Sequence, residues 1–208
     1  MMGFALPVVA LALVALIGWR TGKIKTRKGQ GKLVAAFFVV WMLLSAVENF
    51  FPIENLFLTF HSPEAAYRFQ SSGVTDIQVI EGEQSAFVWG TDKDDAIAFR
   101  IIPKTDKGWK CSGVLDVDFP EFYPDSGIVV TVFRHKRSGD CYALVENMRK
   151  KNSVITDERG SQFQPEEESA EQMYYEYYRS FAYIGQPSGT YTLTVDGVDY
   201  TLTGLPED

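Results

Sequence analysis

Histidine and cysteine are scarce in this sequence, with two of each among 208 residues. Neither pair has the close spacing of a zinc site, and the chain has no CxxC, HExxH, GxSxG, P-loop or GxGxxG pattern. A serine or cysteine hydrolase needs a base beside its nucleophile, which only long-range folding could supply here. The sequence therefore offers no recognisable catalytic motif. We expect His61 and His135 to be solvated surface residues, and we expect no cofactor.

Charged side chains are missing from two apolar segments near the start, residues 1–19 and 33–47. A helix rises about 1.5 Å per residue, so about 20 apolar residues cross the hydrocarbon of a membrane. The two segments predict membrane-spanning helices at about 3–19 and 33–51, with Glu48 at head-group depth. A buried helical hairpin and a cleaved signal peptide are the alternatives. The signal peptide is disfavoured because the positive charges follow the apolar segment instead of preceding it.

The basic run WRTGKIKTRKGQGK, residues 19–32, separates these segments and carries six positive charges, although the chain as a whole has a net charge of −7. Short basic loops stay on the cytoplasmic side of a membrane. The run therefore predicts an integral plasma-membrane protein with a cytoplasmic loop at 20–32 and with both termini and the C-terminal domain outside. The loop could also contact anionic lipids, but it offers no nucleic-acid reading element. Its basic residues are Arg20, Lys23, Lys25, Arg27, Lys28 and Lys32.

The remaining chain predicts a juxtamembrane connector, residues 52–61, and a globular domain, residues 62–208. Ser62 is a good N-cap and Pro63 suits the first turn, which predicts a helix ending near Gln70. Short β-type runs with turn signals every 8 to 12 residues follow. The clearest is a hairpin of residues 190–195 and 198–203 around Asp196-Gly197.

The predicted fold class follows from these segments. We expect a membrane-anchored chain in which a two-helix transmembrane hairpin, residues 1–51, precedes a mainly antiparallel β domain. That domain is α+β or sandwich-like, has one leading helix, and has a soft internal boundary near residues 120–127.

Cys111 and Cys141 both fall on strand-like runs. In an oxidising compartment they could form a disulfide that closes a loop of about 30 residues. They could equally be two separate buried thiols. Both readings remain open from the sequence.

Four carboxylates cluster in LDVDFPEFYPDSG: Asp116, Asp118, Glu121 and Asp125. Such oxygen ligands suit Ca²⁺, but the spacing matches no known calcium loop. A solvated acidic edge, which discourages aggregation between strands, is the favoured reading, and the four residues are kept as metal candidates.

Tyrosines gather in MYYEYYRSFAY, residues 173–183. In a strand they would divide between two faces, one of them in the core. The other could stack on a carbohydrate or a protein, although a sandwich that covers both faces is favoured. The candidate binding residues are Tyr174, Tyr175, Tyr177 and Tyr178.

These features predict a membrane-tethered, extracytoplasmic, non-catalytic binding or accessory module of the cell envelope. The alternatives are an extracytoplasmic hydrolase that uses the clustered carboxylates and a small subunit of a membrane complex. The expected partners are the lipid bilayer and an envelope protein or polymer, with no nucleic acid.

Overall fold

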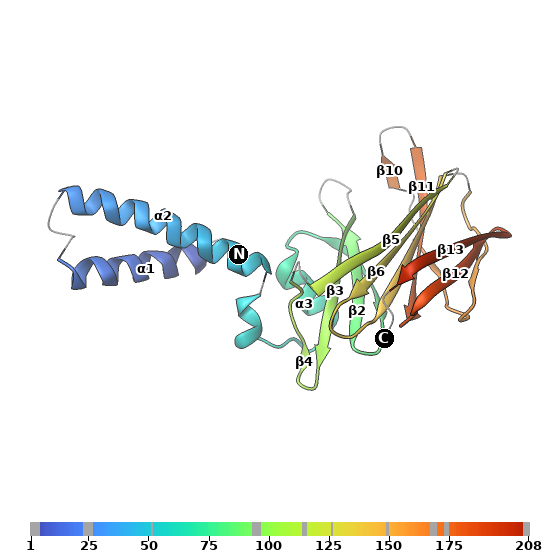
Figure 1. Ribbon diagram of the computed structural model, residues 1–208, viewed down its shortest axis with the longest axis horizontal. Helices are drawn as coiled ribbons and strands as arrows, with labels where there is room; N and C mark the ends of the chain where they lie inside the picture. The colour runs from blue at the N-terminus through green and yellow to red at the C-terminus, as the bar shows by residue number, and fades with distance from the viewer. Residues whose placement is uncertain are drawn as a thin grey trace. The chain divides into compact units, whose positions relative to one another are not determined.

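The computed structural model describes residues 5–22, 27–50, 52–92, 97–113, 116–125, 127–148, 150–166, 170–172 and 175–205 (Figure 1). The chain divides into two compact units, Met1–Ile53 and Glu54–Asp208. We call them the helical unit and the β unit and describe each by itself.

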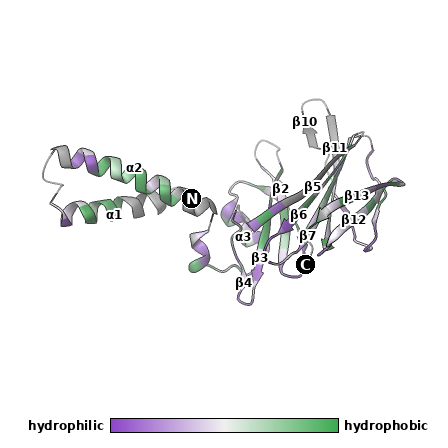
Figure 2. Cartoon of the chain, viewed as in Figure 1, coloured by the Kyte–Doolittle hydropathy of each residue, from purple (hydrophilic) through white to green (hydrophobic). Residues whose placement is uncertain are grey.

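The helical unit contains α1 (Ala5–Arg20) and α2 (Arg27–Phe50), which pack against each other. On α2 the half-buried side chains recur with helical spacing, which places them on one face. They are Leu33, Phe37, Val40 and Leu44. Many other apolar side chains of both helices are exposed, and the helices are coloured largely as hydrophobic in Figure 2. The large ones are Leu11, Leu13, Leu16, Ile17, Trp19, Val34, Phe38, Val39, Trp41, Met42 and Leu43.

The structure contradicts the predicted transmembrane hairpin. Across the described residues, no helix combines the length and the apolar character that crossing a membrane requires. α1 has 16 residues, which corresponds to about 24 Å, whereas the hydrocarbon core is about 30 Å thick. α2 is longer, but its first turns are the polar sequence RKGQGK. The predicted placement in the plasma membrane rested on this hairpin and is therefore wrong as well. That placement had loop 20–32 in the cytoplasm and the termini and C-terminal domain outside.

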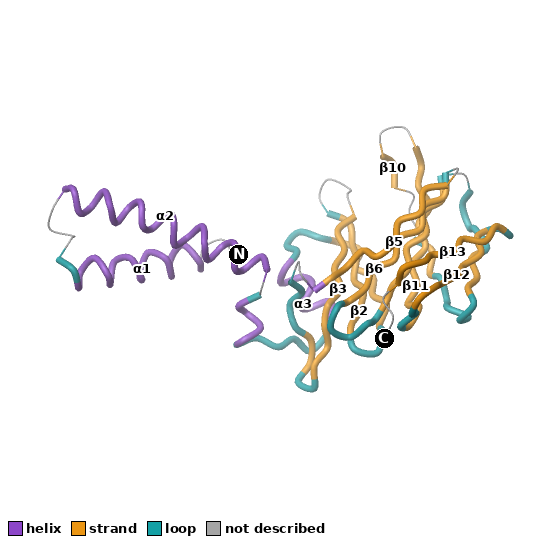
Figure 3. Tube along the Cα trace, in the orientation of Figure 1, coloured by secondary structure: helices purple, strands orange, loops and turns teal. Residues whose placement is uncertain are grey.

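The β unit contains three antiparallel sheets (Figure 3). The first has the order β1-β2-β3-β4 and the third the order β13-β12-β8. The second has the order β10-β11-β7-β6-β5, with β9 also paired to β11. The strands of the first sheet are β1 (Thr75–Glu81), β2 (Ser85–Thr91), β3 (Ile97–Thr105) and β4 (Gly108–Trp109). Those of the second are β5 (Val117–Asp125), β6 (Ile128–His135), β7 (Cys141–Asn147), β9 (Gln164–Pro165), β10 (Ala170–Gln172) and β11 (Tyr175–Gly185). Those of the third are β8 (Ile155–Asp157), β12 (Gly189–Val195) and β13 (Val198–Leu205).

The sheets stack in layers because side chains alternate along each strand. On β7, Tyr142 and Leu144 face the first sheet, whereas Ala143 and Val145 face the third. α3 (Pro63–Gln70) covers the outer face of the first sheet through Tyr67 and its neighbours. The predicted mainly antiparallel β domain with one leading helix is present, and β7, inside its second sheet, is buried on both faces.

Aromatic rings fill the layer between the first and second sheets. The Phe87 ring centroid lies 5.4 to 5.8 Å from those of five other rings. They belong to Trp89, Phe99, Phe133, Tyr142 and Phe181. Phe87 has no exposed surface and contacts rings of both sheets, so it stabilises the packing of one sheet on the other.

Two local predictions are confirmed. The Ser62 hydroxyl accepts the Ala65 backbone N–H at 3.2 Å and caps α3, which ends at Gln70. β12 and β13 pair around Asp196-Gly197, where both residues have positive φ angles, 48° and 87°, as a tight hairpin turn requires.

The position of Phe87 predicts a large loss of stability on truncation. Phe87→Ala should reduce the free energy of unfolding by about 3–5 kcal/mol, because it removes the ring at the centre of the layer. Urea unfolding measures this. Val198→Ala is the control, since Val198 is 51% exposed, and it should change stability by less than about 0.5 kcal/mol. Equal losses in the two variants would contradict this description of the core.

Candidate functional site

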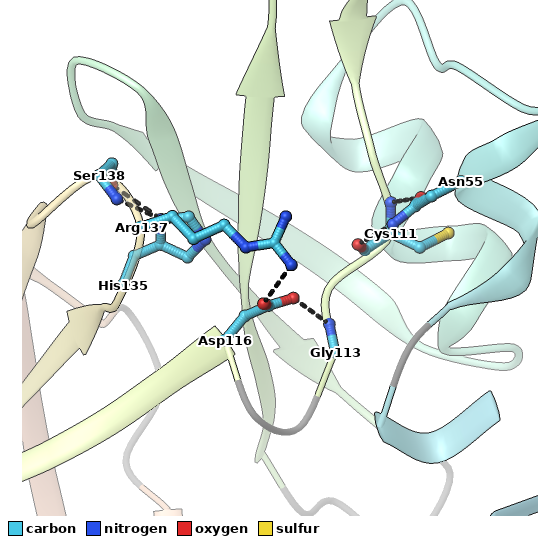
Figure 4. Close-up of polar contacts among 7 residues, drawn as sticks. All are labelled: Asn55, Cys111, Gly113, Asp116, His135, Arg137 and Ser138. Carbon is cyan, nitrogen blue, oxygen red and sulfur yellow. Dashed lines mark hydrogen bonds and ion pairs between the residues drawn. The ribbon is translucent and has the colours of Figure 1, made fainter. Parts of the chain in front are cut away.

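Two of the four carboxylate candidates, Asp116 and Asp118, lie beside the turn that joins β6 and β7. Asp116, just before β5, accepts the Gly113 backbone N–H at 2.9 Å and pairs with Arg137 at 3.4 Å (Figure 4). Its backbone oxygen accepts the Lys136 N–H at 2.8 Å. Asp118 pairs with Lys136 at 2.9 Å. Lys136 and Arg137, which directly follow β6, thus balance the charge of both carboxylates.

These ion pairs bear on the predicted metal site. The basic side chains of Arg137 and Lys136 already contact Asp116 and Asp118. Among the described residues, no group of three or more His, Cys, Asp or Glu side chains could hold a metal ion. The backbones of Glu121 and Asp125 pair with Val132 and Ile128 in β6. Their side chains lie outside the described structure, so a metal role for them stays a prediction.

His135 is buried, with 2% of its surface exposed, so the prediction of a solvated residue is wrong for it. Its Nδ1 lies 2.8 Å from the Ser138 Oγ and accepts the Ser138 N–H at 3.3 Å (Figure 4). The neutral ring therefore carries its hydrogen on Nε2, which is buried without a hydrogen-bond partner in the described structure. His61, in contrast, is exposed as predicted.

The Ser138–His135 contact lacks the arrangement of a catalytic pair. A catalytic histidine is oriented through its second ring nitrogen by a carboxylate or an equivalent group. Here no such group contacts Nε2 in the described structure. The Ser138 Oγ instead accepts the Asp140 N–H at 3.2 Å, so the contact closes the β6–β7 turn.

This turn positions Asp140, which is fully buried between the first and second sheets. One carboxylate oxygen accepts the Gln84 N–H at 2.9 Å and the Ser85 hydroxyl at 2.7 Å. The other accepts the Tyr183 hydroxyl at 3.2 Å. The Tyr142 hydroxyl lies 2.8 Å from the Ser85 Oγ. We call this set the Asp140 cluster: Gln84, Ser85, Asp140, Tyr142 and Tyr183.

The Asp140 cluster favours protonated tyrosines. Burial, with the nearby Asp140 charge, raises the pKa of Tyr183 to about 12. Burial also raises the pKa of Tyr142. Both phenols therefore stay protonated near neutral pH: the Tyr183 hydroxyl donates to the Asp140 carboxylate, and the Tyr142 hydroxyl contacts the Ser85 hydroxyl. No Cβ would fit at Gly82, since it would lie 2.6 Å from the Tyr142 Oη. The cluster joins two sheets and is closely packed around Gly82.

The two cysteines are free, buried thiols, which contradicts the candidate disulfide and agrees with the alternative of two separate buried thiols. Cys141 faces the layer between the second and third sheets. Cys111 lies beyond β4, where its backbone exchanges two hydrogen bonds with the Asn55 side chain at 2.7 and 2.8 Å (Figure 4). Burial raises the pKa of each thiol to about 12, so neither is a ready nucleophile near neutral pH.

The predicted aromatic binding face lies in and beside β11. Tyr178 is half-buried and its backbone pairs with Asn147. For Tyr175 and Tyr177 the structure describes the backbone alone, and Tyr174 is outside the described residues. The binding role of this face stays a prediction.

Four of the six basic residues of the predicted loop, residues 20–32, lie in the two helices and not between them. Arg20 ends α1 with an exposed side chain, and Lys32 is exposed on α2. Arg27 and Lys28 begin α2. The other two basic residues, Lys23 and Lys25, lie outside the described residues.

Sequence reasoning missed the Asp140 cluster. The motif Arg137-Ser138-Gly139-Asp140 predicts a turn, and the turn is present, but nothing local indicates that Asp140 is buried. Its partner Ser85 lies 55 residues earlier in the chain. A related pair escaped notice as well: the Tyr191 hydroxyl donates to Asp157 at 2.7 Å.

Comparisons of the chain with protein-family models, with curated proteins and with solved structures gave no match.

The burial of His135 predicts that the protein becomes less stable as the pH is lowered. Burial lowers the pKa of His135 below its ordinary value of 6.5, although Asp116 and Asp140 oppose this. The unfolded chain therefore takes up a proton at a higher pH than the folded chain. The contribution is complete above the unfolded pKa and declines as the pH falls towards the folded pKa. Urea unfolding at several pH values should show this decline.

His135→Gln should flatten the dependence, because the titrating ring is gone. His61→Gln is the matched control and should keep the wild-type dependence, since its ring is exposed. An unchanged slope in His135→Gln would contradict the assignment.

The free thiols predict a simple alkylation pattern. Iodoacetamide should leave the native chain unmodified near neutral pH, because both thiols are buried with a pKa of about 12. In denaturant without reductant, mass spectrometry should show both cysteines alkylated. If alkylation of the unfolded chain required prior reduction, a disulfide would be present after all.

Proposed function

We propose that this protein is a non-catalytic binding or accessory module whose binding surface is carried by the β unit. One observation carries the proposal: the side chains best suited to chemistry are engaged in holding the fold together. Asp140 accepts three hydrogen bonds from two neighbouring elements. His135 closes a turn, and both thiols are buried.

The construction of the β unit supports the same proposal. Three stacked sheets bury β7 of the central one on both faces, which gives a rigid scaffold on which loops and edges can present contacts. Its expected partners are an envelope protein or polymer and a lipid bilayer.

The alternative function is a hydrolase that uses the clustered carboxylates. A glycosidase needs two carboxyl groups facing one bond, one of them protonated. Asp116 and Asp118 instead pair with Arg137 and Lys136, at 3.4 and 2.9 Å, so both carboxylates already contact basic side chains. This arrangement favours the binding module.

One experiment separates the two functions. Purified full-length protein is incubated with isolated cell-envelope polymer and with envelope proteins, and both binding and the mass of the bound material are measured. The proposal expects saturable binding with the material unchanged. The double variant Asp116→Asn, Asp118→Asn should bind as well as the wild type. Cleavage of the material by the wild type, lost in the double variant, would overturn the proposal in favour of the hydrolase.

A further inference from the structure

An exposed apolar tip stands at the start of the β unit. The 3-10 helix η3 (Ile53–Leu56) ends in Leu56, whose side chain is 77% exposed, and Phe57, which follows, is 82% exposed. Leu58 is 39% exposed. In the β unit these three are consecutive, large and apolar, whereas Val154 and Val198 are smaller exposed side chains that are not consecutive in the chain. Leaving a phenylalanine ring in water is unfavourable, so the tip is a candidate contact surface.

The backbone of the tip is held firmly although its side chains are exposed. The backbone N–H groups of Phe57 and Leu58 both donate to the backbone oxygen of Glu54, at 2.9 and 2.7 Å. The Asn55 side chain exchanges two hydrogen bonds with the Cys111 backbone. Leu56 and Phe57 are thus presented on a fixed turn, which lowers the entropy cost of inserting them into a partner.

Charged side chains of both signs lie within and beside the tip, with Glu54 in the 3-10 helix itself and lysines next to it. The Lys110 ammonium donates to the Asn55 and Leu58 backbone oxygens, at 2.9 and 2.7 Å. The turn between β3 and β4 packs closely against Phe60: a Cβ atom added at Gly108 would lie only 2.5 Å from the Phe60 backbone oxygen. That turn carries the exposed Lys107 and one exposed acidic residue, Asp106.

We propose that residues 56–58 form a lipid-contacting tip, with Leu56 and Phe57 entering the head-group region of an anionic bilayer and Lys107 and Lys110 facing its phosphates. Apolar side chains flanked by lysines are complementary to such a surface, which is negative outside and apolar beneath. Contact at the surface requires no helix to cross the bilayer. The proposal deepens the proposed function by assigning residues to its lipid partner, and it rests on that function.

The test reads out the tip itself, because the helical unit also exposes apolar side chains that could bind vesicles. Thr59→Cys in the full-length chain places a thiol beside the tip, at an exposed position. An environment-sensitive fluorophore is attached there, and the two buried native cysteines should stay unlabelled. The labelled protein is mixed with phosphatidylcholine vesicles that contain or lack phosphatidylglycerol, and with vesicles that carry a head-group quencher.

We expect a blue shift and quenching on phosphatidylglycerol vesicles, with a smaller response on pure phosphatidylcholine. The double variant Leu56→Ser, Phe57→Ser should lose both signals, and Lys107→Gln should weaken them. Val198→Cys, labelled in the same way on β13, is the control and should show no response. Val154→Ser, Val198→Ser is the matched apolar control for the tip and should leave the Thr59 signal unchanged.

An unchanged signal at Thr59 would overturn the proposal whether or not the chain sediments with vesicles. A response that appears with an added protein and not with lipid would also overturn it, in favour of a protein partner. In either case the envelope-binding assay still decides the proposed function, because that assay contains no vesicles and its result does not depend on the tip.

Discussion

The burial of β7 on both faces is the constraint on which the β unit depends. Successive side chains of this strand enter two different layers, so each layer limits what the other can hold. The aromatic layer around Phe87 takes Tyr142 and Leu144, while the aliphatic layer takes Ala143 and Val145. A strand with two buried faces has little freedom of register, since a shift of one residue would exchange the two sets.

A buried carboxyl group is compatible with this packing because the fold surrounds it with hydrogen-bond donors. Asp140 comes just before β7 and would be costly without partners. Donors from the first sheet and from β11 satisfy both of its oxygens. The turn that holds Asp140 is in turn closed by Ser138 and His135. One polar chain thus runs from the β6–β7 turn into the layer between the sheets, and it gives a structural role to residues that could otherwise suggest chemistry.

The two proposals place function on the outside of this scaffold. The interior groups are engaged, while the exposed tip at Leu56 and Phe57 is held by hydrogen bonds to the segment after β4. A rigid scaffold that presents a fixed apolar turn suits a module that works by contact.

The sequence by itself determined the local elements of the β unit. The Ser62 cap, the extent of α3, the hairpin at Asp196-Gly197 and the antiparallel β class all follow from short-range rules on capping, turns and alternation. The two apolar segments near the start of the sequence do lie in helices, α1 and α2. The prediction that these helices cross a membrane was wrong, because α1 is too short and α2 begins with a polar stretch. Tertiary structure alone decided that His135 and Asp140 are buried, that Cys111 and Cys141 remain apart, and that Asp116 and Asp118 meet cations. Each of these depends on partners many residues away along the chain, and the pairing order that brings them together is set by packing between sheets, which no local pattern records.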